Sequence, residues 1–274
     1  MKMRILSALI GIPLTCVVLL FYQTPVLNCA MALLIGIAAY EMTWRTGMVK
    51  NRVMVTAAIV CTAAAPLLMM VPNRSYWLGW LLLAFLAVEI GTFFVCHMTA
   101  DFQQLSVTIV SAFFLAAAFG SLVLLRDMAG VVGLYYIMFS FVCAWISDGG
   151  AYFVGRAFGR HKMCPRISPK KTWEGLVGGL VIGVAAICLY SWIFSCFVPL
   201  NVNYPLVILV GVLGSLLSVF GDLCASIMKR HAEIKDFGNL IPGHGGILDR
   251  FDSMLFLSPF LCLVLGLGGI VALA

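Results

Sequence analysis

The chain has 274 residues, of which 63% are hydrophobic and only 10% are charged, and its formal net charge is +6. A soluble domain has roughly a quarter of its residues charged, so this composition excludes an ordinary soluble fold. Apolar runs of about 20 residues, the length that a helix needs to cross a bilayer, recur along the sequence. We therefore expect an all-α fold, a polytopic bundle of helices integral to a membrane.

The predicted elements begin with a basic and then apolar segment, "MKMRILSALIGIPLTCVVLLFY". No clear small-x-small cleavage site follows its long apolar run, so we expect a retained first helix rather than a signal peptide. Breaks that contain charged residues, Pro or Asn divide the chain into about nine apolar spans. In chain order these are 5–22, 25–43, 53–71, 76–95, 105–125, 132–154, 173–199, 205–228 and 251–273.

Positive charge gives these spans an orientation. If the N-terminus is cytoplasmic, the inside segments contain all 17 Lys and Arg residues except Arg74 and Arg126. Cytoplasmic loops of membrane proteins are enriched in Lys and Arg. We therefore predict a cytoplasmic N-terminus and a C-terminus outside.

The two halves differ in polarity. Residues 1–130 have short connections and few polar groups within spans, Glu41 and Glu89 being the exceptions, and are predicted to form a transmembrane scaffold. Residues 131–274 contain two charged cytoplasmic segments, 155–172 and 229–250, and are predicted to form the catalytic transmembrane domain.

Small side chains are expected to serve packing. Glycines at four-residue spacing in "GLVGGLVIG" (Gly175, Gly179 and Gly183) permit close helix contact, which we expect inside one bundle, while a homodimer face stays open. The ten cysteines are dispersed without a CxxC pair, so neither a zinc site nor a disulfide framework is predicted.

Two aspartates lie late in predicted spans, near the cytoplasmic side: Asp148 in "CAWISDGGAYFVG" and Asp222 in "LSVFGDLCASIMKR". An ionised aspartate at the bilayer centre costs about 2.5–3.5 kcal/mol on insertion scales, so such residues normally face a polar interior. For either one alone, a hydrated aspartate or one paired structurally with Lys or Arg explains the sequence as well as a functional aspartate does. Together, beside two basic segments, they indicate a functional site.

The segment "SPKKTWEG" precedes the seventh span. Ser168 and the following proline favour a turn. Lys170 and Lys171 are adjacent at a helix start, where Thr172 is expected to be the N-cap with Glu174 in the first turn. Lysines held there would bind a triphosphate or a lipid phosphate. The preceding basic run, "GRAFGRHKMCPR", is also what an ordinary cytoplasmic loop in contact with anionic lipid would contain.

The segment "SIMKRHAEIKDFGNLIPGHGGILDRFD" gathers charges of both signs. If the eighth span stays helical to residue 230, Asp222 and Ser226 share one stripe with Lys229 or Arg230. The "PGHGG" run requires a backbone without side-chain bulk. Asp249 and Asp252 follow at the start of the last span, where the helix dipole favours negative charge.

Carboxylates from different helices, beside cations and a glycine loop, suit Mg²⁺-dependent phosphate chemistry. Mg²⁺ is held by one or two carboxylates and by substrate phosphate oxygens. Lys and Arg neutralise the remaining phosphate charge, and glycine N–H groups approach it closely. The sequence has no GxxxxGK[ST], which excludes a P-loop nucleotide site.

These residues also resemble a known family. The run from Ser226 through Lys235 and Asp236 to "PGHGGILDRFD" is similar to the signature of the phosphatidate cytidylyltransferases, or CDP-diacylglycerol synthases. "SPKKTWEG" and the "D-x-GAYxxGRxFGR" run from Asp148 resemble two further blocks of that family. The three blocks cover roughly a quarter of the chain. Gly149 departs from the pattern, where Thr is more usual, and this puts a hydroxyl contact there in doubt.

The resemblance implies transfer of CMP from CTP to phosphatidic acid, giving CDP-diacylglycerol and pyrophosphate, at the cytoplasmic face of a bacterial inner membrane. It implies Mg²⁺ held by Asp222 and Asp249, with a second, monovalent cation in the same site left open. The implied catalytic residues are Asp222, Asp249, Lys229, Arg230, Lys235 and Lys171. The implied substrate-binding residues are Asp148, Ser168, Lys170, Thr172, Glu174, Ser226, Asp236, His244, Gly245, Gly246, Arg250 and Asp252.

Three other functions are compatible with parts of the sequence. A CTP-dependent transferase acting on another lipid phosphate would share the nucleotide half of the site. A transporter usually has paired repeats around a midplane site, whereas here polar residues gather at one membrane face. A non-catalytic scaffold leaves the Asp/Lys/Gly pattern unexplained. The expected partners are CTP, phosphatidic acid and membrane lipids, with no nucleic acid.

Overall fold

A computed structural model describes residues 2–241, 243 and 245–273, which are mostly helical. Contacts along the chain divide it into two compact units, each composed of two segments. Unit 1 contains Met1–Val123 and Lys229–Phe251, and unit 2 contains Leu124–Met228 and Asp252–Ala274. The segment 229–251 thus belongs to the same compact unit as the first 123 residues. The assignment of catalysis to residues 131–274 stays a prediction.

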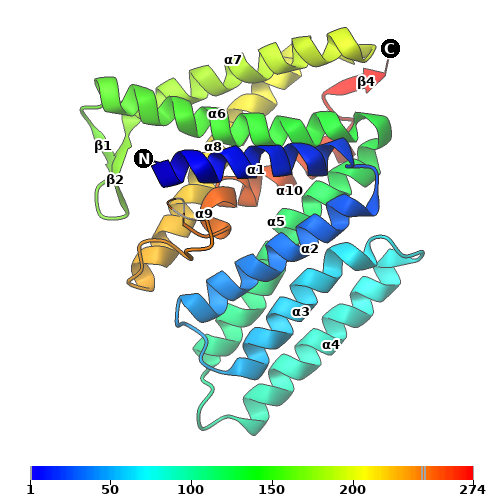
Figure 1. Cartoon of the computed structure of the whole chain (residues 1–274), viewed down its shortest axis with the longest axis vertical. Helices are drawn as coiled ribbons and strands as arrows, with labels where there is room; N and C mark the ends of the chain where they lie inside the picture. Colours follow the sequence, from blue (N-terminus) through cyan, green and yellow to red (C-terminus); the bar gives the residue numbers. More distant parts are fainter. Residues whose placement is uncertain (1, 242, 244, 274) are drawn as a thin grey trace. The chain divides into compact units, whose positions relative to one another are not determined.

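Unit 1 begins with α1 (Lys2–Leu20) and α2 (Pro25–Tyr40), which continues into the π-helical turn η1 (Glu41–Arg45). After these come α3 (Arg52–Leu68), α4 (Arg74–Val95) and most of α5 (Phe102–Ala129). The helices α2, α3 and α4 lie side by side (Figure 1). The second segment adds the end of α8 and the four-residue helix α9 (Leu248–Phe251).

Local sequence explains where the unit 1 helices begin. Thr24 precedes Pro25 at the start of α2, and its side chain accepts a hydrogen bond from the Val26 N–H. The Asn51 carboxamide accepts from the N–H groups of Val53 and Met54 at the start of α3. Side-chain oxygens at these positions satisfy N–H groups that have no partner within the helix.

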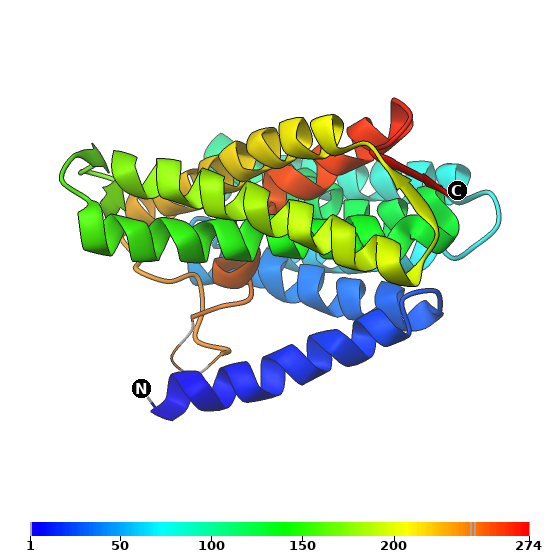
Figure 2. The same ribbon diagram turned by 90° about the horizontal axis from the view of Figure 1, so that it is seen from above.

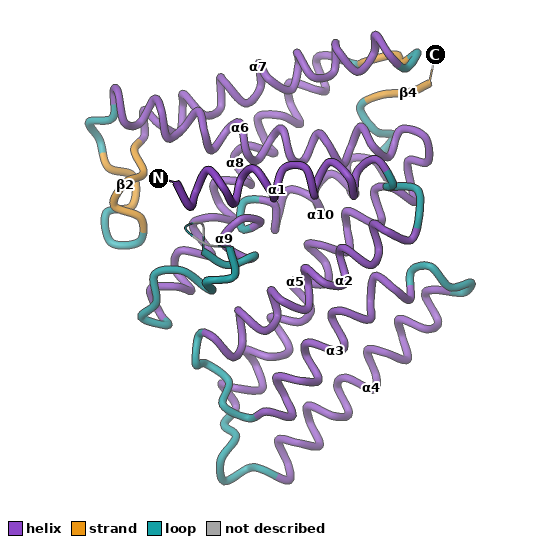
Figure 3. The backbone as a smooth tube through the Cα atoms, in the orientation of Figure 1, coloured by secondary structure: helices purple, strands orange, loops and turns teal. Residues whose placement is uncertain are grey.

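Unit 2 contains η2 (Gly130–Val132), α6 (Gly133–Phe158), α7 (Trp173–Phe197), most of α8 (Tyr204–His231) and α10 (Met254–Gly266). Two short, two-stranded antiparallel sheets accompany these helices (Figure 3). In one, β1 (Lys162–Cys164) pairs with β2 (Ser168–Thr172), and in the other, β3 (Leu200–Val202) pairs with β4 (Val271–Leu273).

The helices α6 and α7 run alongside each other (Figure 2). A Cβ atom on Gly175 would lie 2.7 Å from the Ala151 carbonyl oxygen, and one on Gly179 would lie 2.7 Å from that of Ser147. A Cβ atom on Gly183 would lie 2.9 Å from the Ser147 Cβ. The prediction that these glycines permit close packing inside one bundle is therefore confirmed.

Within the described residues, six helical segments are long and apolar enough to cross a membrane: Pro25–Arg45, Arg74–Val95, Phe102–Met128, Gly133–Phe158, Trp173–Phe197 and Tyr204–His231. Two shorter helices, Arg52–Leu68 and Met254–Gly266, are also apolar. The chain is therefore an integral membrane helical protein. Each of the nine predicted ranges overlaps a helix in the described part, while nine crossings and the orientation of the termini stay predictions.

Two local predictions differ from the structure. The last predicted span, 251–273, begins at the final residue of α9, and its longest helix is the 13-residue α10. Gly268 and Gly269 follow it with φ of 118° and 70°, which ends the helix before β4. The turn expected at Ser168 lies instead at residues 165–167, and Ser168 is the first residue of β2, because the chain folds back to pair with β1.

Candidate active site

Asp249 is the centre of a cluster of predicted site residues in unit 1. Its Oδ1 accepts a hydrogen bond from the Lys229 Nζ at 2.8 Å. Its Oδ2 accepts from the backbone N–H groups of Phe237 at 2.8 Å and Gly246 at 2.9 Å. The side chains of Asp249 and Lys229 are 4% and 12% exposed. Asp249 therefore balances a buried cation and also fixes the backbone on both sides of the glycine loop.

The loop itself needs glycine, as the sequence predicted. Gly243 and Gly245 have φ of 79° and 87°, a region that side-chain-bearing residues rarely adopt. A Cβ atom on Gly245 would also lie 2.8 Å from the Asp249 Oδ2. The Ile241 N–H donates to the Gly245 carbonyl at 2.9 Å and closes the loop. His244, a predicted substrate-binding residue, lies outside the described residues.

The remaining charged residues predicted for this cluster lie around the same loop with exposed side chains. Arg230 is in the last turn of α8, Lys235 and Asp236 follow in the loop, and Arg250 is in α9. Their exposure allows the three cations to contact a phosphate group from solvent.

Glu41 is a unit 1 residue to which the sequence assigned no role. Its side chain is almost wholly buried, with 2% of the residue exposed. Its Oε1 accepts from the Ile247 N–H at 3.1 Å, and its Oε2 accepts from the Leu248 N–H at 2.9 Å. The signal that could have found it was a carboxyl group at the end of an apolar run, which normally has a partner.

Asp222 is the centre of a second cluster, in unit 2. Its Oδ2 forms an ion pair with the Lys171 Nζ at 2.7 Å, and its Oδ1 accepts from the Ser226 hydroxyl at 3.4 Å. The Lys171 ammonium also donates to the Val219 carbonyl at 3.4 Å. Because α8 extends to His231, the prediction that Asp222 and Ser226 share one face of this helix is confirmed.

Asp148 and Asp252 belong to the same unit and are joined by Ser253. The Ser253 hydroxyl donates to the Asp148 Oδ2 at 2.5 Å, and the Ser253 N–H donates to the Asp252 Oδ1 at 2.8 Å. Gly221 leaves room for the Asp252 carbonyl oxygen, which a Cβ atom there would approach to 2.5 Å. Ser253 was missed from the sequence because a serine after "LDRFD" carries no signal of its own.

The start of α7 is built largely as predicted. Thr172 is its N-cap, and the Thr172 Oγ1 accepts from the Gly175 N–H at 3.1 Å. Glu174 lies in the first turn and pairs with the His161 ring at 2.6 Å, which ties the β1–β2 hairpin to the helix. Lys170 is exposed on β2, whereas Ser168 is partly buried at the start of that strand.

The donor chemistry of both aspartates fits Mg²⁺. The described residues contain no group of three or more His, Cys, Asp or Glu side chains able to hold a metal. Mg²⁺ does not need one, because waters and substrate phosphates complete its shell around one or two carboxylates. A carboxylate has about four lone-pair sites, of which Asp222 uses two and Asp249 three in the contacts above. The two residues belong to different units, and their joint binding of one cation stays a prediction.

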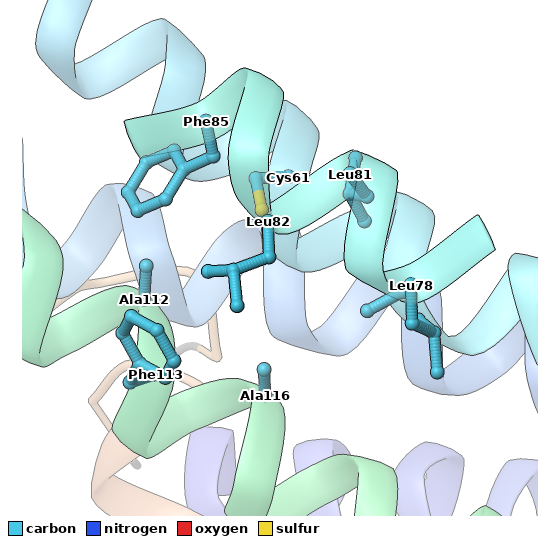
Figure 4. A pocket seen from close by; sticks show the side chains of 9 residues that line it. Cys61, Leu78, Leu81, Leu82, Phe85, Ala112, Phe113 and Ala116 are labelled. Carbon is cyan, nitrogen blue, oxygen red and sulfur yellow. The ribbon is translucent and has the colours of Figure 1, made fainter. Parts of the chain in front are cut away.

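A pocket in unit 1 has the wrong chemistry for a nucleotide. It lies between α3, α4 and α5 and encloses about 190 Å³ (Figure 4). Its lining carries no charged side chain and no hydroxyl group, and consists of Cys61, Ala65, Leu78, Leu81, Leu82, Phe85, Ala112, Phe113 and Ala116. Nothing in this lining could neutralise a phosphate. The candidate functional residues are therefore those of the two Asp–Lys clusters.

Comparison with known proteins gives concordant matches. The sequence model of the cytidylyltransferase family matches residues 2–267. A Bacillus subtilis protein named phosphatidate cytidylyltransferase is 40% identical over 169 residues, which cover 62% of this chain and 61% of the relative. Proteins of the same name from Staphylococcus haemolyticus and Staphylococcus aureus (strain COL) are each 45% identical, over 133 and 135 residues. These two matches cover 48% of this chain and 50% of each relative.

Proposed function

The chain belongs to the cytidylyltransferase family, and from this premise we propose that it transfers CMP from CTP to phosphatidic acid. The products would be CDP-diacylglycerol and pyrophosphate. Support for this activity comes chiefly from one recurring arrangement: at two family motifs, a lysine ammonium contacts an aspartate, Lys171 with Asp222 and Lys229 with Asp249. A site for a triphosphate needs cations that are already held in place and carboxylates that can bind a metal.

The proposed roles follow from the chemistry of each side chain. Lys171 and Lys229 neutralise phosphate charge, and the exposed Arg230, Lys235 and Arg250 add to this neutralisation. Mg²⁺ held by Asp222 and Asp249 would make the α-phosphorus more electrophilic and stabilise the departing pyrophosphate. A second, monovalent cation in the same site stays open.

No general base is proposed. The phosphate oxygen of phosphatidic acid is already anionic at neutral pH, so it needs no deprotonation before it attacks the α-phosphorus of CTP. Positioning of the two substrates and neutralisation of charge therefore carry the catalysis. The substrate-binding roles of Asp148, Ser168, Lys170, Thr172, Glu174, Ser226, Asp236, His244, Gly245, Gly246 and Asp252 remain part of this proposal.

We also propose nine membrane crossings with the N-terminus in the cytoplasm, in a bacterial inner membrane. The distribution of Lys and Arg supports this orientation. Both motif segments then face the cytoplasm, where CTP is found. Single-cysteine labelling in intact cells tests the arrangement. Residues near Lys50 and Lys170 should resist a membrane-impermeant maleimide, whereas residues near Arg74 should react, and the opposite pattern would overturn the orientation.

The activity is tested with purified protein in detergent micelles that contain phosphatidic acid, CTP and Mg²⁺. We expect pyrophosphate release that depends on all three components and stops when EDTA removes Mg²⁺. The Bacillus subtilis relative serves as the positive control. Absence of release with CTP and with dCTP, under conditions where the control is active, would refute the proposal.

The same assay identifies the lipid substrate. If an isoprenoid phosphate or an ether-linked lipid phosphate competes better than phosphatidic acid, the protein is a CTP-dependent transferase for that lipid. Preference for phosphatidic acid supports the activity proposed here.

A further inference from the structure

Within unit 1, Glu41 connects the end of α2 to the glycine-containing loop between α8 and α9, called the motif loop below. Its carboxylate accepts hydrogen bonds from two consecutive N–H groups, those of Ile247 and Leu248, immediately before Asp249. Hydrogen bonds from N–H groups to an ionised carboxylate are stronger than those to a neutral acceptor. Burial of a carboxyl group is costly unless such partners compensate for the lost water. Glu41 therefore holds the chain at the point where the loop enters α9.

Two glycines of the motif loop make room for this carboxylate. A Cβ atom on Gly246 would overlap both carboxylate oxygens of Glu41, and one on Gly238 would overlap Oε1. Neither glycine has the positive φ that explains Gly243 and Gly245. Gly238 and Gly246 are thus explained by the space that Glu41 occupies, and not by backbone conformation.

The helix that carries Glu41 is irregular at this residue. After α2 ends at Tyr40, residues Glu41–Arg45 form a π-helical turn. Such turns are rare and occur frequently at functional sites, because they change the direction of side chains along a helix. Hydroxyl groups in and next to this turn donate to backbone carbonyls: Thr43 to that of Ala39 at 2.6 Å, and Thr46 to that of Met42 at 2.8 Å.

We propose that Glu41 is a positioning residue for catalysis: it fixes the backbone at Ile247 and Leu248, and so sets the direction of the Asp249 carboxylate. The loop is then held by two carboxylates, because Asp249 binds the N–H groups of Phe237 and Gly246 while Glu41 binds the next two N–H groups along the chain. The link to catalysis rests on the proposed function. The effect on the loop does not.

Unit 1 offers a matched control in Glu89. This glutamate of α4 is also fully buried, and neither of its carboxylate oxygens has a hydrogen-bond partner among the described residues. Replacing Glu89 with Gln removes no described hydrogen bond. Replacing Glu41 with Gln puts an amide NH₂ group opposite an N–H donor. Both substitutions make the same change of side chain at a buried position, and only the one at Glu41 removes described hydrogen bonds.

The test compares Glu41→Gln with Glu89→Gln in the purified full-length protein. Hydrogen–deuterium exchange at Ile247 and Leu248 should accelerate in Glu41→Gln by about tenfold or more, the factor that corresponds to about 1.4 kcal/mol. If Glu41 directs Asp249, the turnover number should fall by about tenfold as well, and the Mg²⁺ concentration for half-maximal activity should rise. Glu89→Gln should match the wild type in all three measurements. A general loss of folded protein would lower turnover without moving the Mg²⁺ midpoint.

A pair of alanine variants tests the contact directly. Gly246→Ala should loosen the loop because its methyl group displaces the Glu41 carboxylate. In the Glu41→Ala background that methyl group has room, so the double variant should be no worse than Glu41→Ala alone. Gly120→Ala, where a Cβ atom meets nothing within 4 Å, is the glycine control.

Exchange and activity separate the two proposals. Wild-type exchange and an unchanged Mg²⁺ midpoint in Glu41→Gln would overturn the role of Glu41, and so would fully additive losses in the double variant. If the wild-type protein releases no pyrophosphate, the proposed function fails, and the exchange measurements alone decide whether Glu41 positions the loop.

Discussion

Asp249 and Glu41 of unit 1 are hydrogen-bonded in a different way from Asp222 and Asp148 of unit 2. In unit 1, Asp249 and Glu41 accept hydrogen bonds from four backbone N–H groups. In unit 2, Asp222 and Asp148 accept from side chains, those of Lys171, Ser226 and Ser253. A backbone donor is fixed by the fold, whereas a lysine or serine side chain can rotate away. Asp249 and Glu41 are therefore built into the loop, whereas Asp222 and Asp148 can exchange partners.

The Asp249 and Asp222 side chains also differ in how far they are exposed to solvent. The Asp249 side chain is 4% exposed, and the Asp222 side chain is 27% exposed. A ligand that arrives from solvent therefore reaches Asp222 more easily than Asp249. We infer that Asp222 contributes mainly to metal and phosphate chemistry, whereas Asp249 contributes to both chemistry and loop structure. Substitutions that separate activity from stability distinguish these roles.

The largest expected effect is on activity, in Asp222→Asn. An amide cannot supply the negative charge that Mg²⁺ and Lys171 require, so pyrophosphate release should fall by about 10²–10³-fold, the loss typical when one electrostatic contact to a reacting group is removed. The partly exposed site should tolerate the amide, so expression and the unfolding temperature should stay close to those of the wild type. Near-normal activity would remove Asp222 from the proposed metal ligands.

The second-largest effect is expected on stability, which Asp249→Asn should lower. This change removes the negative charge that contacts the buried Lys229 ammonium and replaces one of the two acceptor oxygens with an NH₂ donor. Loss of one partner of a buried ion pair costs about 3–5 kcal/mol. Thermal unfolding in detergent should therefore occur at a clearly lower temperature than in Asp222→Asn, the matched substitution in the other unit. Equal unfolding temperatures would contradict the distinction between the two carboxylates.

Much of the local structure around the candidate site could be predicted, because the sequence patterns that indicate it involve residues close together in the chain. The helix stripe of Asp222 and Ser226, the Thr172 cap and the need for glycine at Gly243 and Gly245 each depend on residues a few positions apart. The long apolar runs likewise indicated the helices, since a continuous apolar stretch has few alternatives in a membrane protein.

Features that join distant segments were not predictable. Glu41 lies more than 200 positions from Ile247 in the sequence, and Ser253 lies 105 positions from Asp148. No periodicity or spacing encodes such pairs, because they arise only when helices pack. The grouping of residues 229–251 with the first segment of the chain likewise depends on contacts between segments that are distant in the sequence. The short last helix was missed because apolar composition alone does not show where glycines end it.

Adjacent lysines provide a sharper test within unit 2. Lys171 contacts Asp222, whereas Lys170 is exposed on β2. We expect Lys171→Met to raise the KM for CTP by about tenfold, because one phosphate-neutralising ammonium is lost at the cluster. Lys170→Met should raise it by a smaller factor, because the described contact with Asp222 is made by Lys171. Equal effects of the two substitutions would show that the contact with Asp222 does not decide which lysine serves the substrate.

The smallest effect is expected where a neutral hydroxyl, rather than a carboxylate, binds the backbone. Thr172 caps α7 through the Gly175 N–H, and loss of an N-cap side chain costs about 1 kcal/mol. Thr172→Ala should therefore lower the unfolding temperature slightly, and Thr172→Ser, which keeps the hydroxyl, should restore most of the loss. If Thr172→Ser has normal stability and Thr172→Ala also loses about tenfold or more in activity, the hydroxyl contacts substrate as well. An activity loss no larger than the stability loss would limit Thr172 to holding the start of the helix beside Lys171.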